Sequence, residues 1–238
     1  MANSMVIGSF KKEISRIINP DEVLLPQIWK LDRDEYLKVI NSPHWMFVPS
    51  PRMFEWGFFE AFSHIKWYHI IFLPVLLFCY LLYRIESWES FSLMMSITAF
   101  IGGFLLWTFA EYLLHRFVFH SEYWLPDSRL IRYLHYILHG IHHMLPNDPY
   151  FKTLYRDRLV HPHVLLSIEL SILFPLAIKI IRIDDPILFA FFWIGFGIGY
   201  ICYDLTHYML HHVDTSKHKG SWFHKLQKYH NQHHFGGE

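Results

Sequence analysis

The chain has 238 residues, of which 53% are hydrophobic and 19% aromatic, and its formal net charge is zero. Only 18% of the residues are charged, against roughly 25% in an ordinary soluble domain. This apolar content excludes disorder as the main state. The balance of 21 basic and 21 acidic residues leaves no electrostatic footprint for binding nucleic acid. Histidine is the unusual residue, with 19 copies.

Residues 1–66 are predicted to form an amphiphilic N-terminal segment. The first residues are polar and charged, and they lack the apolar core and cleavage site of a secretory signal peptide. Aromatic residues gather between Trp45 and Phe59, which is typical of a segment at a membrane–water interface. We therefore expect an interfacial segment that leads into the main domain, residues 67–238.

Four apolar runs follow this segment, and each is close to the roughly 17–25 residues that cross a bilayer as a helix. They cover about residues 67–83, 91–110, 164–181 and 187–203. The alternative is a soluble all-helical protein, but its buried core helices would more often have apolar runs of roughly 10–14 residues. The sequence therefore predicts an all-α integral membrane protein with four transmembrane helices in two hairpins.

The distribution of basic residues predicts the orientation. The short loops within the hairpins and the adjoining helix end hold Arg84, Lys179 and Arg182, whereas the other 18 basic residues lie at the two termini and in the central segment. Because loops rich in Lys and Arg face the cytosol, we expect both termini and the central segment there. Residues 111–163 and 204–238 would then form a cytosolic cap.

Ten of the histidines form four motifs, all within the predicted cap: HRFVFH, HGIHH, HYMLH and HNQHH. Residues at i, i+3 and i+4 share one face of a helix, so each HxxHH motif should present three imidazoles on one stripe. The ten are His115, His120, His139, His142, His143, His207, His211, His230, His233 and His234.

Ten imidazoles exceed what one ion can bind, whereas two ions with four or five nitrogens each would use them all. His115 and His120 lie five residues apart, so they require a slight unwinding of the helix or serve neighbouring metals. The two cysteines lie inside apolar runs and offer no thiolate site, which excludes an iron–sulfur cluster.

Acidic residues near the motifs are candidate partners for the second nitrogen of ligating imidazoles. Glu111 and Asp204 are the residues we select for this role, Asp204 first because it precedes His207 by three residues. His135 is a further neighbour of the motifs, either as such a partner or as a solvent-exposed residue.

The stretches EYLLHRFVFH, LHGIHHMLPNDP, GYICYDLTHYMLHH and KYHNQHHF resemble those of fatty acid 2-hydroxylases in the fatty acid hydroxylase/sterol desaturase superfamily. The resemblance covers about Tyr36 to Phe235, and the family's ten metal-binding histidines match the ten residues above one by one. It implies a multi-pass protein of the endoplasmic reticulum membrane, with four transmembrane helices and a cytosolic dimetal site.

The resemblance also implies the reaction, which is O2-dependent hydroxylation at C2 of a long or very long fatty acyl chain, free or in ceramide. Many members carry a fused cytochrome b5 domain with an HPGG motif, which is absent here. A separate cytochrome b5 and its reductase are therefore the expected electron donors.

The sequence departs from the family pattern in two further respects. Extra residues (YFKTLYRD) separate NDP from RLV, and HPH then follows where the family has an aromatic residue and two prolines. We expect these changes to affect the cap loop over the substrate. Relatives also continue beyond the final FGGE, and we expect this difference either to weaken the cap or to reflect a truncated sequence.

Hydroxylation of an unactivated C–H bond requires a redox-active metal, so iron is the expected metal. Zinc is the alternative, because it satisfies the same histidines but has no redox chemistry. The alternative functions are oxidation of a sterol, an inactive regulatory relative, and a non-catalytic membrane metal-binding protein. A metal carrier should place its ligands within the spans, whereas these ten histidines lie beyond them.

Overall fold

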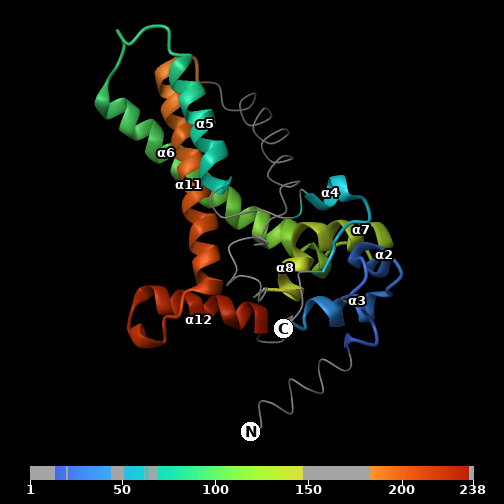
Figure 1. The fold of residues 1–238 in the computed structure, drawn as a ribbon. Helices are drawn as coiled ribbons and strands as arrows, with labels where there is room; N and C mark the ends of the chain where they lie inside the picture. Colours follow the sequence, from blue (N-terminus) through green and yellow to red (C-terminus); the bar gives the residue numbers. More distant parts are fainter. Residues whose placement is uncertain are drawn as a thin grey trace. The chain divides into compact units, whose positions relative to one another are not determined.

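The computed structural model describes residues 14–19, 21–43, 51–61, 63, 69–146 and 183–235. Every element of secondary structure within these ranges is helical, which confirms the predicted all-α class for the described part of the chain (Figure 1). The chain divides into two compact units. Unit 1 comprises Met1–Ile65, Phe119–Leu165 and Tyr208–Glu238, and unit 2 comprises Lys66–Val118 and Leu166–His207.

Four helical elements form the described part of unit 2: α5 (His69–Tyr83), α6 (Leu93–Leu113), the π-helical turn η1 (Leu114–Phe119) up to Val118, and the part of α11 (Pro186–His212) that ends at His207. Among the described residues, two continuous helices are long and apolar enough to cross a membrane, namely Leu93–Phe119 and Pro186–His212. They coincide with the second and fourth predicted spans. The apolar part of α5 is shorter, the third predicted span lies outside the described residues, and the arrangement of four spans remains a prediction.

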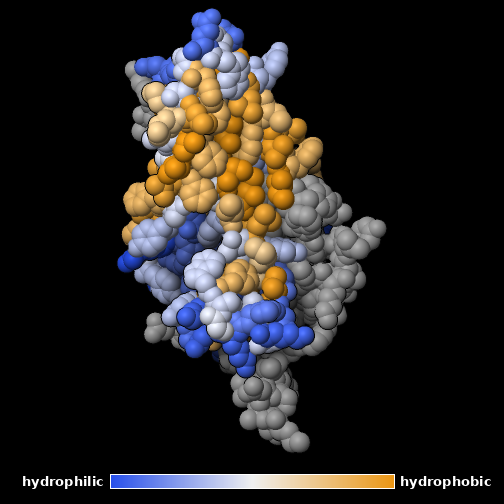
Figure 2. Space-filling view, turned by 90° about the vertical axis from the view of Figure 1, so that its left-hand side faces the viewer, coloured by the Kyte–Doolittle hydropathy of each residue, from blue (hydrophilic) through white to orange (hydrophobic). Residues whose placement is uncertain are grey.

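The surface of α6 is apolar and open. Leu105 and Phe109 are each 59% exposed, and only 17% of the apolar window of this helix is buried. Figure 2 shows a broad hydrophobic surface over the helices of unit 2. The core helix of a soluble protein would bury such side chains, because exposing them to water costs about 1.5–3 kcal/mol each. The exposure therefore favours membrane helices over the soluble alternative.

Glycines allow α6 and α11 to approach each other closely. A Cβ added to Gly103 would lie 1.9 Å from the backbone oxygen of Phe192, and one added to Gly195 would lie 2.0 Å from the backbone oxygen of Phe100. Further along the same helix pair, the indole of Trp107 packs edge-on against an aromatic ring of α11, with ring centroids 5.1 Å apart. Small residues that permit backbone contact are typical of helix pairs in membranes.

Unit 1 is built from short helices. They are α2 (Leu24–Ile28), α3 (Arg33–Ile40), α4 (Gly57–Ala61), η2 (Ser121–Tyr123), α7 (Arg129–His135), η3 (Tyr136–Gly140), α8 (Ile141–Met144), η6 (Ser216–His218) and α12 (Trp222–Phe235). Side chains fix two of their N-termini. Asp32 forms a capping box with Glu35 at the start of α3, and the Ser128 hydroxyl accepts a 3.1 Å hydrogen bond from the backbone of α7. Such caps are each worth about 1 kcal/mol.

The core of unit 1 joins the N-terminal helices to the segment that carries the HGIHH motif. Leu24, Ile28 and Val39 belong to one buried cluster with Tyr136 and Met144. The helices α2 and α3 thus pack against η3 and α8, on which the histidines lie. The interfacial role assigned to residues 1–66, and their separation from a domain 67–238, remain predictions.

Candidate metal centre

Each of the first two histidine motifs lies at a π-helical turn. One such turn, η1 (Leu114–Phe119), continues α6 and contains His115, and the other, η3, contains His139. A π-turn closes i→i+5 hydrogen bonds and is wider than an α-turn, so residues five apart come closer to a common face. The helix is therefore unwound just before His120, and which metal each of His115 and His120 would bind remains a prediction.

Three histidines of unit 1 form what we call the first cluster: His120, His139 and His233. Their ligand nitrogens lie within 4.8 Å of one another. The Nε2 atoms of His120 and His233 are 3.0 Å apart, and the rings of His120 and His139 meet edge to face with centroids 4.9 Å apart.

Four other histidines of unit 1 form the second cluster: His142, His211, His230 and His234. Their ligand nitrogens also lie within 4.8 Å of one another. The Nε2 of His230 is 2.7 Å from that of His211 and 3.2 Å from that of His234. The end of α11 and one face of α12 thus bring together residues that are 19 positions apart in the sequence.

His143 lies between the two clusters. Its Nε2 is 3.0 Å from Nε2 of His139 in the first cluster, and its ring centroid is 4.5 Å from that of His234 in the second. It is also buried. The structure therefore brings together eight of the ten predicted histidines within unit 1.

The other two predicted ligands and the two selected acids lie in unit 2. His207 is one turn before His211 on α11, so both residues lie on the same side of that helix. Glu111 Oε1 is 4.0 Å from Nδ1 of His115, and Asp204 is buried. The role of these four residues in a metal site remains a prediction.

One carboxylate beside the first cluster was not selected from the sequence. Glu122 Oε1 lies 3.0 Å from Nδ1 of His120, and its Oε2 lies 2.6 Å from Nε2 of His135. His135 is 2% exposed, so the solvent-exposed alternative for this residue is wrong. The position of Glu122, two residues after His120, was the available signal in the sequence.

The electrostatics of the clusters suit neutral imidazoles. Burial, reinforced by neighbouring histidines, lowers the pKa of His230 and His233 to about 4. The same causes place the pKa of His143 and His234 well below the ordinary range of histidine. These side chains are therefore uncharged at neutral pH, which is the form that binds metal.

The spacing of the nitrogens also fits metal ions. Two nitrogens that are each about 2.1 Å from one ion lie about 3–3.4 Å apart, and the Nε2 pairs of both clusters are at or near this separation. Without a proton or an ion between them, two facing lone pairs would repel each other. Neutral imidazoles suit iron, copper, nickel and zinc, so the histidine clusters could hold such ions.

Comparison with known protein families identifies the family of the chain. The family model described as fatty acid hydroxylase matches residues 100–238. The chain belongs to the fatty acid hydroxylase family. The family predicted from the histidine motifs is thereby confirmed, and the match covers every histidine of the two clusters.

Curated relatives of this fatty acid hydroxylase agree with the family model. The chain is 33% identical to the fatty acid 2-hydroxylase of Mus musculus, over 88% of this chain and 57% of that protein. It is 31% identical to the ceramide very long chain fatty acid hydroxylase of Saccharomyces cerevisiae, over 96% of this chain and 55% of that protein. It is 36% identical to a dihydroceramide fatty acyl 2-hydroxylase of Arabidopsis thaliana, over 85% of this chain and 78% of that protein.

A solved structure has the same fold. It is described as full-length scs7p with only the hydroxylase domain visible, and it matches with a TM-score of 0.76 and 29% identity over 96% of this chain and 80% of that chain. The chain spans a little over half the length of the mouse and yeast relatives.

Proposed function

We propose that this family member hydroxylates C2 of long or very long fatty acyl chains, free or in ceramide, to give 2-hydroxy sphingolipids. The observation that carries the proposal is the pair of adjacent histidine clusters in unit 1, whose ligand nitrogens lie within 4.8 Å of one another in each cluster. The relatives named above support the acyl substrate, since their names specify fatty acid or fatty acyl hydroxylation.

The ten predicted histidines would hold two metal ions. Bound there, redox-active ions such as iron would supply the O2 chemistry that imidazole cannot perform alone. The protein contributes uncharged nitrogen donors, because burial keeps the pKa of residues such as His230 low. The π-turns and α12 also fix the directions in which the histidine nitrogens point. Ligands that are held rigidly reduce the cost of placing the substrate and the metal in the geometry of the reaction. We include His115 and His207 as ligands, with Glu111 and Asp204 as their partners.

The membrane arrangement belongs to the same proposal. α6 and α11 would be two of four transmembrane helices, with the others at about residues 67–83 and 164–181. The cap, residues 111–163 and 204–238, would face the cytosol from the endoplasmic reticulum membrane. A separate cytochrome b5 and its reductase would deliver the electrons.

The test is mass spectrometry of sphingolipids from a hydroxylase-deficient host that expresses the chain. We expect 2-hydroxyacyl ceramides from the intact chain and none from His233→Ala. His218→Ala is the matched control, because His218 is exposed and belongs to neither cluster, and it should retain the product. Unchanged product with His233→Ala would contradict the role of the first cluster, and oxidised sterols in place of hydroxylated ceramides would contradict the acyl substrate.

A further inference from the structure

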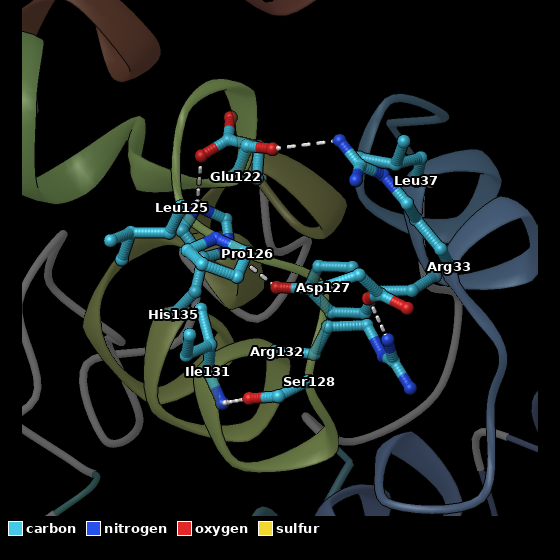
Figure 3. A pocket seen from close by; sticks show the side chains of 11 residues that line it. Arg33, Leu37, Glu122, Leu125, Pro126, Asp127, Ser128, Ile131, Arg132 and His135 are labelled. Carbon is cyan, nitrogen blue, oxygen red and sulfur yellow. Dashed lines mark hydrogen bonds and ion pairs between the residues drawn. The ribbon is translucent and has the colours of Figure 1, made fainter.

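A buried chain of polar contacts leads from the first cluster to the N-terminal helices. Glu122 contacts His120 with one carboxylate oxygen and His135 with the other, at 3.0 and 2.6 Å. On its far side, Nδ1 of His135 is hydrogen-bonded to the hydroxyl of Tyr36, which is 1% exposed. Figure 3 shows Glu122 and His135 facing each other beside a small cavity. Four residues from three separate parts of the sequence thus form one connected network.

The partners determine which nitrogen carries each proton. Nε2 of His135 faces two groups that only accept, Glu122 Oε2 at 2.6 Å and the Phe119 carbonyl oxygen at 2.8 Å, so this nitrogen must carry the hydrogen. Its Nδ1 then accepts from the Tyr36 hydroxyl. At the other end, Nδ1 of His120 donates to Glu122. This tautomer leaves the lone pair of His120 on Nε2, the atom that faces His233.

The charges of the network agree with this pattern. Glu122 Oε1 faces Nδ1 of His120 and its Oε2 faces Nε2 of His135, so the carboxylate is the acceptor at the centre of the network. Burial, with Glu122 nearby, raises the pKa of Tyr36 well above its ordinary value, so Tyr36 keeps the proton that it donates.

The basic groups around this cavity do not neutralise the carboxylate of Glu122. Arg132 pairs with Asp127 and donates to the carbonyl of Leu31 at 3.0 Å. Arg33 reaches the backbone carbonyl of Glu122, at 3.4 Å, rather than its side chain. Each arginine is therefore engaged elsewhere, and the side chain of Glu122 is held by the two imidazoles.

We propose that Glu122, supported by His135 and Tyr36, is a positioning residue that orients His120 and strengthens it as a metal ligand of the first cluster. The inference rests on the proposed function, since it concerns the same metal site. It gives the N-terminal segment a task at this site, because Tyr36 lies on α3, outside the range 100–238 that the family model matches. Mutation of a carboxylate that holds the second ring nitrogen of a ligating histidine typically lowers metal affinity by about 10–100-fold.

The experiment is a titration of the purified, full-length, metal-free chain with Co²⁺, followed by its visible absorption and by competition with a chelator. For Glu122→Gln we expect one of two bound ions to bind about 10–100-fold more weakly, with an altered cobalt spectrum, while the other is retained. Glu122→Asp should restore part of the affinity. Glu89→Gln is the matched control, since Glu89 is an exposed carboxylate in unit 2, and it should titrate as the unchanged chain does.

Tyr36→Phe tests the outer part of the network without removing the carboxylate. This variant should still bind both ions, but its affinity for one of them should fall by a few-fold. The reason is that His135 loses a hydrogen-bond donor and Glu122 is held less firmly. If Glu122→Gln fails to fold, as judged by its circular dichroism, Glu122→Asp and Tyr36→Phe decide the matter. If the folded variants bind two Co²⁺ with the affinity and spectrum of the unchanged chain, the role of Glu122 is wrong. The proposed metal centre would survive that result, because the chain still binds metal. An unchanged chain that binds no Co²⁺ would instead overturn the proposed metal centre itself.

Discussion

Replacement of Gly103 by alanine should weaken the packing of α6 against α11. A Cβ at this position would lie 1.9 Å from the backbone oxygen of Phe192. An ordinary contact requires about 3.4 Å, so the two helices must separate locally by about 1.5 Å. A gap of about 0.5–1 Å already removes a quarter to a half of a dispersion contact, and the obstacle is backbone, which cannot rotate away as a side chain can.

These numbers give a magnitude. Overpacking of a well-packed interface typically costs about 1–3 kcal/mol, and contact with backbone places Gly103→Ala near the upper end of that range. Alanine also favours the helical conformation over glycine by up to about 1 kcal/mol, which offsets part of this cost. The net loss is about 2 kcal/mol, which corresponds to a decrease in melting temperature of roughly 4–8 °C for a chain of this size.

The assay is thermal unfolding of the purified chain in detergent, with Gly102→Ala as the control. A Cβ on Gly102 would lie 3.6 Å from the ring of Phe192, an ordinary contact, so this neighbouring variant should melt at or slightly above the original temperature. Gly195→Ala should behave like Gly103→Ala, because its Cβ would lie 2.0 Å from the backbone oxygen of Phe100. If Gly103→Ala melts as high as Gly102→Ala, the close approach of these helices is wrong.

Three further predictions concern the metal centre. The metal-free protein should become less stable as the pH is lowered from about 6.5 to about 4, because unfolded His230 and His233 take up protons that the folded protein accepts only near pKa 4. A melting temperature that is constant over this range would contradict the lowered pKa of these two histidines. Protein loaded with zinc alone should form no hydroxylated product, whereas the iron-loaded protein should, and full activity with zinc would refute the expectation of a redox metal. His143→Ala should reduce the affinity for both ions in a Co²⁺ titration, since His143 contacts both clusters; loss of affinity at one site only would show that it serves a single cluster.

The sequence was sufficient for features that depend on local patterns. The length of an apolar run is a property of consecutive residues, and two of the predicted spans therefore coincide with α6 and α11. Histidine spacing similarly predicted residues such as His230 and His234, which share one face of α12 and whose Nε2 atoms lie 3.2 Å apart.

The network of Glu122, His135 and Tyr36 beside the first cluster could not be predicted from local patterns. Tyr36 and His135 are 99 positions apart in the sequence, so no periodicity connects them, and their contact exists only because α3 packs against the segment of α7 and η3. Glu122 has no helical spacing to either residue, since it lies in the short turn η2. These contacts depend on tertiary packing, and a pattern within one helix does not contain that information.

The expectation that each HxxHH motif would present one stripe needs a physical correction. His233 belongs to the first cluster and His234 to the second, as adjacent residues on a helix must point about 100° apart. His139 and His142 are divided between the clusters in the same way, and His143 lies between them. Each HxxHH motif therefore contributes to both clusters, so the separation of the two clusters is determined by the geometry of single rigid helices. A shift of α12 would consequently alter both clusters together, and it would move two ions of the proposed centre more tightly in concert than a separate motif for each ion would.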